Sequence, residues 1–209
     1  HKIFTNLILP ERVACMVIEP VQGEGGYLPA PKRFISELRK ICDEHGILMI
    51  FDEVQSGYGR TGYLFAKDYY GVQPDIFTSA KAIANGIPLS AVIGKTEYMD
   101  KWLAGAHGGT FGGNPLACAA GCAVLDVMDD EFLEDVRKKG EFIRERLEDL
   151  KAKHSNVISS IRGIGMMNGV EFRKDGKPLT KVVSKVQELA LSKGLILLNC
   201  GTFHNVIRL

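Results

Sequence analysis

An apolar run, an amphipathic helical pattern and a second apolar run follow one another near the start of the chain. Residues 13–19 (VACMVIE) are typical of a buried strand, and so are residues 47–52 (ILMIFD). Between them, Pro31 opens a helical pattern that runs to about His45, and Gly46 follows it. Strand, helix and strand in this order predict a βαβ unit, whose strands are parallel and buried on both faces.

The remaining pattern predicts an α/β fold made of two incomplete domains. Residues 1–130 are expected to be part of a large domain with a mostly parallel sheet. Residues 131–209 are expected to hold a connecting helix and part of a smaller C-terminal α+β domain. The further elements that we expect are strands at 74–79, 89–94 and 195–199, helices at 114–128, 131–153 and 180–193, and two strands around a glycine turn within 157–172.

Charge and cysteine usage exclude several classes of function. The 26 basic side chains balance 25 acidic ones, so the net charge of +1 gives no electrostatic case for nucleic acid or an anionic membrane. No apolar run approaches the length of a membrane span. The five cysteines are scattered and odd in number, which argues against a disulfide framework or a metal site and favours a reducing, cytoplasmic location. The chain begins without Met and stops inside an expected strand, so we expect a piece of a longer protein.

Gly57–Gly62 (GYGRTG) matches the G-x-G-x-x-G fingerprint of dinucleotide-binding domains. In such a domain the strand runs directly into the glycine turn, whereas residues 53–56 intervene here. The residues after Gly62 supply no acid at the right distance for the ribose contact, since Asp75 comes too early. We therefore interpret the glycines as an active-site or interface loop and keep dinucleotide binding only as an alternative.

Asp52 ends the strand at 47–52, and Lys81 comes directly after the strand at 74–79. The carboxyl ends of parallel strands form the edge where open α/β sheets bind ligands. Either residue alone is explained by a salt bridge or by surface exposure. Together they suggest a Schiff-base lysine and an acid that faces a pyridinium nitrogen. The glycine-rich loop 107–115 could bind a phosphate through backbone amides and Thr110, whereas a lone His107 is more often structural.

Four segments, in this order and at this spacing, resemble class III pyridoxal-phosphate aminotransferases of fold type I. They are IEPVQGEGGYLPAP (18–31), ILMIFDEVQSGYGRTG (47–62), PDIFTSAKAIANGIPLSAV (74–92) and GGTFGGNPLACAA (108–120). The family includes 4-aminobutyrate, ornithine and acetylornithine aminotransferases, and the first and last segments are most similar to the 4-aminobutyrate enzymes.

The resemblance implies a role for each matching residue. Lys81 would form the Schiff base with pyridoxal 5'-phosphate and shuttle protons, and Asp52 would pair with the pyridine nitrogen. Val54 would pack on one face of the ring, and Gln55 would contact its 3-oxygen. Thr110 would bind the phosphate across the interface of a homodimer with shared active sites.

The resemblance also implies how substrates are selected. Arg208 would bind the carboxylate of glutamate or 2-oxoglutarate, and Glu24 would neutralise Arg208 when an ω-amino substrate occupies the site. We therefore expect transamination of an ω-amino substrate with 2-oxoglutarate as acceptor. An ornithine or acetylornithine aminotransferase, or an amino-acid racemase or epimerase on the same scaffold, remains an alternative. Other parts of the family's site would lie upstream, so we expect that residues 1–209 alone do not hold the cofactor productively.

Overall fold

The computed structural model describes residues 2–209, which form two compact units. The first unit contains the residues up to Pro20 together with 30–58 and 65–129. The second unit contains 130–209 and also two short upstream segments, 21–29 and 59–64. No local sequence pattern assigns these two segments to the second unit, because partners such as Arg162 for Gly26 and Met166 for Arg60 lie more than a hundred residues further along the chain.

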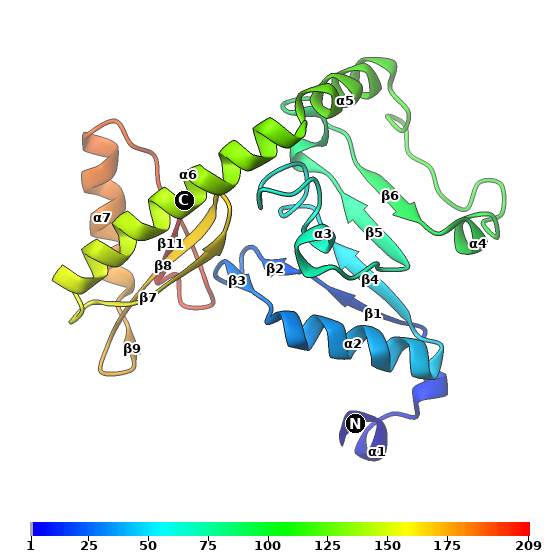
Figure 1. The fold of residues 1–209 in the computed structure, drawn as a ribbon, viewed down its shortest axis with the longest axis horizontal. Helices are drawn as coiled ribbons and strands as arrows, with labels where there is room; N and C mark the ends of the chain where they lie inside the picture. The colour runs from blue at the N-terminus through cyan, green and yellow to red at the C-terminus, as the bar shows by residue number, and fades with distance from the viewer. Residues whose placement is uncertain (1) are drawn as a thin grey trace. The chain divides into compact units, whose positions relative to one another are not determined.

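The first unit is built on a four-stranded sheet in the order β1-β4-β5-β6 (Figure 1). Strands β1 (Cys15–Ile18), β4 (Leu48–Asp52) and β5 (Ile76–Ser79) are parallel to one another. Strand β6 (Ala91–Gly94) closes the sheet antiparallel to β5. The predicted βαβ order and the mostly parallel sheet are confirmed, but the expected burial of both strand faces is wrong for β1, where Val17 is 65% exposed.

Helix α2 (Lys32–His45) connects β1 to β4 and covers their sheet with its apolar face. Its buried residues, Ile35 and Cys42, pack in the same core as Met49 and Phe51 of β4. The helix ends where Gly46 adopts a left-handed conformation with φ of 65°, which glycine reaches without the steric penalty of a Cβ. The alternating burial of β4 shows that one side of the sheet is packed more tightly than the other.

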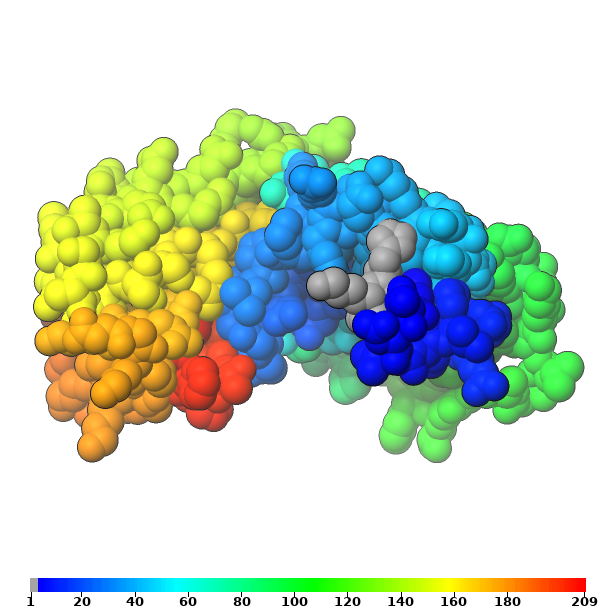
Figure 2. All heavy atoms as spheres, turned by 90° about the horizontal axis from the view of Figure 1, so that it is seen from below, coloured from blue at the N-terminus to red at the C-terminus, as the bar shows by residue number. Residues whose placement is uncertain are grey.

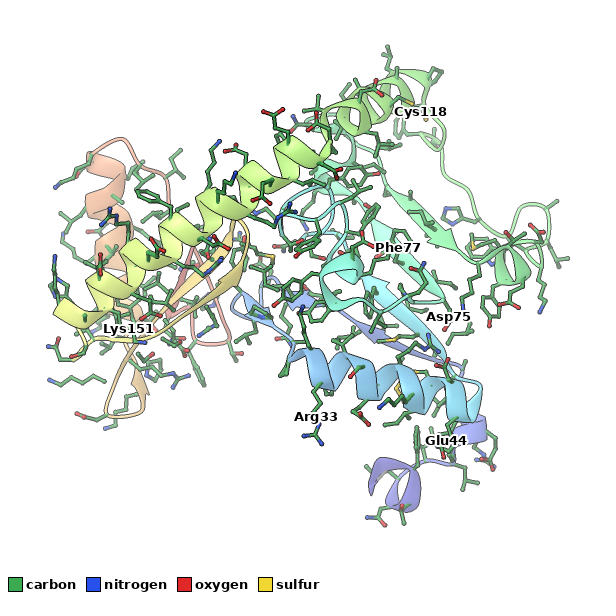
Figure 3. The ribbon with its side chains drawn as sticks, viewed as in Figure 1. Arg33, Glu44, Asp75, Phe77, Cys118 and Lys151 are labelled. Carbon is green, nitrogen blue, oxygen red and sulfur yellow. The ribbon has the colours of Figure 1, made fainter. Side chains whose placement is uncertain are left out.

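Asp75, labelled in Figure 3, is a buried carboxylate that bonds the beginning of β4. Asp75 accepts hydrogen bonds from the Met49 amide at 2.8 Å, from Arg39 at 2.7 Å and from Lys95 at 2.6 Å. Burial by itself would raise the pKa of Asp75, but the bonds from Lys95, Met49 and Arg39 outweigh burial and lower it. Asp75 is therefore an ionised structural anchor rather than a ribose-binding acid.

Short helices and one longer helix complete the first unit. Asn114 caps α5 (Pro115–Val127), because its side-chain oxygen accepts hydrogen bonds from the amides of Leu116 and Ala117 at 2.9 and 3.4 Å. The N-terminal segment is dark blue in Figure 2. Its residue Leu7 is 82% exposed. The helices of this unit besides α2 are α1 (Lys2–Asn6), η1 (Pro10–Arg12), α3 (Ala66–Tyr70), η2 (Lys81–Ala84), α4 (Thr96–Met99) and α5 (Pro115–Val127).

The second unit is an antiparallel sheet in the order β10-β11-β8-β7, packed with two helices. Its core contains Ile158, Val170, Phe172, Val183 and Ile207. Its elements are β2 (Val21–Gln22), β3 (Leu28–Pro29), α6 (Asp130–Lys153), β7 (Ile158–Ile164), β8 (Met167–Lys174), β9 (Lys177–Pro178), α7 (Thr180–Ser192), β10 (Leu198–Cys200) and β11 (Val206–Arg208). Within residues 2–209, no helix has the length and apolarity to cross a lipid bilayer.

The strand expected at 195–199 is displaced toward the C-terminus. Leu195 donates its amide to the carbonyl of Ala190 at 2.9 Å, so it still closes the end of α7. Gly194 makes this reversal possible with φ of 83°. Strand pairing starts only at Leu198, which is opposite Arg208 of β11.

Glu171 of β8 is a carboxylate of the second unit that pairs with two arginine side chains. It accepts hydrogen bonds from Arg162 at 2.7 Å, from Arg173 at 2.6 Å and from Asn205 at 3.3 Å. Burial opposes its ionisation, but the bonds from Arg173 and Arg162 dominate and lower the pKa of Glu171 to about 2. The ionised form therefore stabilises the folded state.

We predict that Glu171→Gln lowers the free energy of unfolding by about 3 kcal/mol at pH 7. The native pKa lies below the ordinary value of 4.5, so this stabilisation is complete above about pH 4.5 and disappears as the pH falls toward 2. Urea denaturation at several pH values measures the difference. Glu188→Gln, at a pair whose side chains are both about two-thirds exposed, is the matched control and should change stability little. Equal losses in the two variants would contradict the role of Glu171.

Candidate functional site

Asp52 is the last residue of β4 and is opposite Thr78 of β5 in the parallel register. Its Oδ1 atom accepts a hydrogen bond from the Val54 amide at 3.0 Å and another from the Thr78 hydroxyl at 3.3 Å. Among residues 2–209, no cationic side chain pairs with Asp52, and no donor reaches its Oδ2 atom. A half-buried carboxylate without a cation is costly, so the end of β4 is suited to a positively charged ligand atom.

Lys81 comes two residues after β5 and begins the short helix η2. Its side chain is exposed, and its backbone is left-handed with φ of 50°. Such a conformation costs a residue with a Cβ roughly 1–3 kcal/mol, and strain of this kind concentrates at functional sites. Because β4 and β5 are parallel neighbours, Lys81 and Asp52 follow the same edge of the sheet. The sequence indicated this edge but gave no sign of the strained backbone.

Val54 and Gln55 lie half-buried in the turn that follows Asp52. Thr110 lies in the exposed loop before α5, and the structure records no hydrogen bond from it to Asp52 or Lys81. The first unit therefore brings the predicted lysine and carboxylate to one sheet edge and leaves Thr110 open to solvent.

Glu24 and Arg208 belong to the second unit and form an ion pair there. The Arg208 side chain is 20% exposed and the Glu24 side chain 68% exposed. The Glu24 carbonyl also accepts a hydrogen bond from the Gly201 amide at 2.8 Å, which holds its segment beside β10. Burial raises the pKa of the neighbouring Cys200 thiol to about 11, so this cysteine is not a thiolate at neutral pH.

The glycines of the fingerprint make a tightly packed turn instead of a phosphate site. No helix starts at Gly62, since α3 begins at Ala66 and is only five residues long. A Cβ on Gly57 would lie 2.9 Å from the Glu53 carbonyl oxygen, and one on Gly62 would lie 2.4 Å from the Arg137 Cγ. These glycines are required by close packing, and the turn lacks the helix start that a pyrophosphate needs.

Glu53 is a residue whose importance sequence reasoning missed. It is fully buried, and its carboxylate bonds the first amides of α3. Consecutive residues of an extended segment face opposite sides of a sheet, so the side chains of Asp52 and Glu53 point in different directions. This alternation was the signal in the sequence that could have assigned the two acids different roles.

We predict that Gly62→Ala destabilises the protein more than Gly71→Ala. Both glycines are left-handed, with φ of 80° and 64°, but a Cβ at Gly71 would meet no atom within 4 Å. Backbone strain alone should cost about 1 kcal/mol at Gly71. Displacing Arg137 should bring the cost at Gly62 to about 2–3 kcal/mol. Urea denaturation of both variants compares the two losses, and equal losses would show that the Arg137 contact is unimportant.

Comparison with known proteins agrees with the motif resemblance. The family model described as aminotransferase class-III matches residues 1–209. The 5-aminovalerate aminotransferase DavT of Pseudomonas aeruginosa is 48% identical over 212 residues, and the match covers 100% of this chain and 50% of that protein. The 4-aminobutyrate aminotransferase GabT of Escherichia coli is 46% identical over 213 residues, with 100% and 50% covered.

The solved structure of an acetylornithine aminotransferase is also similar to this chain. The acetylornithine aminotransferase of Elizabethkingia anophelis superposes with a TM-score of 0.88 at 35% sequence identity, and the match covers 100% of this chain and 51% of that one. The chain thus spans about half the length of the relatives it matches. It belongs to the class III aminotransferases, which depend on pyridoxal phosphate.

Proposed function

We propose that the full-length protein transfers the amino group of an ω-amino acid to 2-oxoglutarate. The observation that supports this most directly is the pair formed by Asp52 and Lys81 after two neighbouring parallel strands. Sequence relatives named for 4-aminobutyrate and 5-aminovalerate support an amino group at the far end of the substrate.

The residues at this sheet edge fit pyridoxal phosphate. Asp52 has a carboxylate oxygen that no donor within residues 2–209 reaches, which suits a protonated ring nitrogen. Lys81 offers an exposed primary amine, the group that attaches this cofactor. Val54 and Gln55, in the turn after Asp52, would contact the ring, and Thr110 would bind the phosphate.

Bound pyridoxal phosphate supplies an electron sink that makes the proton next to the substrate nitrogen removable. Asp52 would keep the ring nitrogen protonated, because an ionised carboxylate favours a neighbouring positive charge. The Lys81 amine would serve as the base that moves the substrate proton, since its position beside the site makes the transfer effectively intramolecular.

The ion pair of the second unit would select between the two substrates. Arg208 would bind the carboxylate of glutamate or 2-oxoglutarate, as a guanidinium does through paired hydrogen bonds. With an ω-amino substrate in place, Glu24 would neutralise Arg208, and the structure holds the pair in this closed arrangement. The ion pair would open for glutamate or 2-oxoglutarate and stay closed for the ω-amino substrate. The same site could then accept both kinds of substrate.

We propose ω-amino acids as the class of amino donor and do not single out one member of that class. Acetylornithine aminotransferases are also among the relatives, for example that of Thermosynechococcus vestitus at 46% identity over 191 residues. An ornithine or acetylornithine donor is thus the second candidate. Racemisation would need no keto acid, so a strict requirement for 2-oxoglutarate separates transamination from it.

We also propose a homodimer with shared active sites and a cytoplasmic location. The first rests on the expectation that Thr110 binds the phosphate of the partner's site. The second rests on the five cysteines, all of which are free thiols in the structure. Light scattering and fractionation of cells measure the two properties.

We predict that borohydride reduction of the full-length protein with bound pyridoxal phosphate attaches the label to Lys81. Asp52→Ala should keep this label, because the amine remains, and should lose about a thousandfold in kcat, because the charge at the ring nitrogen is lost. Peptide mapping and steady-state kinetics measure the two effects. An unlabelled Lys81 in the wild-type protein, or normal turnover in Asp52→Ala, would refute the assignment.

We predict that Glu24→Ala impairs the ω-amino half-reaction about tenfold more than the glutamate half-reaction. Without Glu24, Arg208 stays charged and unpaired and continues to attract carboxylates. Single-turnover assays with 4-aminobutyrate, 5-aminovalerate, acetylornithine and glutamate measure each half-reaction. Glu188→Ala, at an exposed pair, is the control. Equal losses for the ω-amino substrates and glutamate would argue against the gate.

A further inference from the structure

The carboxylate of Glu53 joins the end of β4 to the start of α3. Its Oε2 atom accepts hydrogen bonds from the Ser56 hydroxyl at 2.6 Å and from the Ala66 amide at 2.9 Å. Its Oε1 atom accepts one from the Lys67 amide at 2.8 Å. The side chain is fully buried, so these three donors replace water around the carboxylate.

The backbone of Glu53 is held as firmly as its side chain. Its amide donates to the Thr78 carbonyl at 3.0 Å, which extends the pairing of β4 and β5 one residue beyond Asp52. Its carbonyl accepts from the Gly57 amide at 3.0 Å, which closes the turn that contains Val54 and Gln55. Glu53 therefore lies at the centre of the segment on which the Asp52 carboxylate depends.

The mechanism does not use this carboxylate. The Oδ1 atom of Asp52 accepts a hydrogen bond from the amide of Val54, the residue after Glu53. A shift of the Glu53–Val54 peptide would therefore also move this oxygen. Asp75 gives a comparison: it is a second buried carboxylate, but it bonds Met49 near the opposite end of β4. The strand is thus held by a carboxylate near each end, and only Glu53 adjoins the site.

We propose that Glu53 is a positioning residue, which fixes the turn after β4 to the start of α3 and thereby holds Asp52, Val54 and Gln55 for the cofactor. This proposal rests on the proposed function for the cofactor-binding roles of Asp52, Val54 and Gln55. The anchoring itself rests on contacts within the first unit alone.

The positioning role of Glu53 requires a carboxylate, and the amide of a glutamine, which has the same size, is insufficient. Two of the three donors, the amides of Ala66 and Lys67, cannot become acceptors. A glutamine offers one oxygen and one NH₂ group, so in either orientation the NH₂ would face one of these amides. Burial raises the pKa of the Glu53 carboxyl, and the bonds from Ser56, Ala66 and Lys67 oppose this shift.

The experiment compares Glu53→Gln with Asp75→Asn in the full-length protein. Hydrogen–deuterium exchange without cofactor measures the backbone, and a titration with pyridoxal phosphate followed by absorbance measures affinity. We expect Glu53→Gln to speed exchange at residues 54–57 and 66–67 and to weaken cofactor affinity about tenfold. Asp75→Asn should lower the melting temperature while leaving both the exchange of 54–57 and the affinity near wild-type values.

The outcomes separate this inference from the proposed function. Unchanged exchange at 54–57 in Glu53→Gln, or an equal loss of affinity in Asp75→Asn, would overturn the positioning role. If the wild-type protein binds no pyridoxal phosphate, the proposed function fails, and the exchange data alone then decide whether Glu53 anchors the turn. Should Glu53→Gln not fold, Ser56→Ala removes one donor: faster exchange at the same residues supports the role, and unchanged exchange refutes it.

Discussion

The parallel pairing of β4 with β5 is the contact on which the candidate site depends. It places Asp52 opposite Thr78 and carries the chain on to Lys81 at the same sheet edge. Two residues that are 29 positions apart in the sequence are thereby brought to the same edge of the sheet. The strain at Lys81, with its positive φ, is tolerated because β5 before it and η2 after it are fixed by the sheet and its packing.

Three carboxylates around β4 differ in how completely the protein satisfies their hydrogen-bonding capacity. Asp75 is surrounded by Arg39, Lys95 and a backbone amide, so it is satisfied within the fold. Glu53 is satisfied by a hydroxyl and two amides. Only Asp52 keeps an oxygen that no donor within the described part of the chain reaches. The carboxylate left incompletely paired by the protein is the one available to a cofactor.

Much of the first unit could be predicted from its sequence, because its signals are local. The apolar runs, the amphipathic pattern from Lys32 to His45 and the glycine after it gave β1, α2 and β4 with small errors at the ends. The strand near 195 was misplaced because the end of α7 closes over Leu195, a helix-cap contact that apolarity does not reveal. The assignment of 21–29 and 59–64 to the second unit depends on partners distant in the sequence.

The sequence by itself determined the family and the parallel βαβ unit, and it pointed to Lys81 and Asp52 as candidate site residues, because apolar runs and motifs at fixed spacing are local features of the chain. Only the tertiary structure decided which acid of the Asp52–Glu53 pair faces the site edge and which is buried against α3. It also decided that the glycines after them form a packed turn. The physical reason is that hydrogen-bond partners and close contacts come from segments far apart in the chain, and folding alone brings them together.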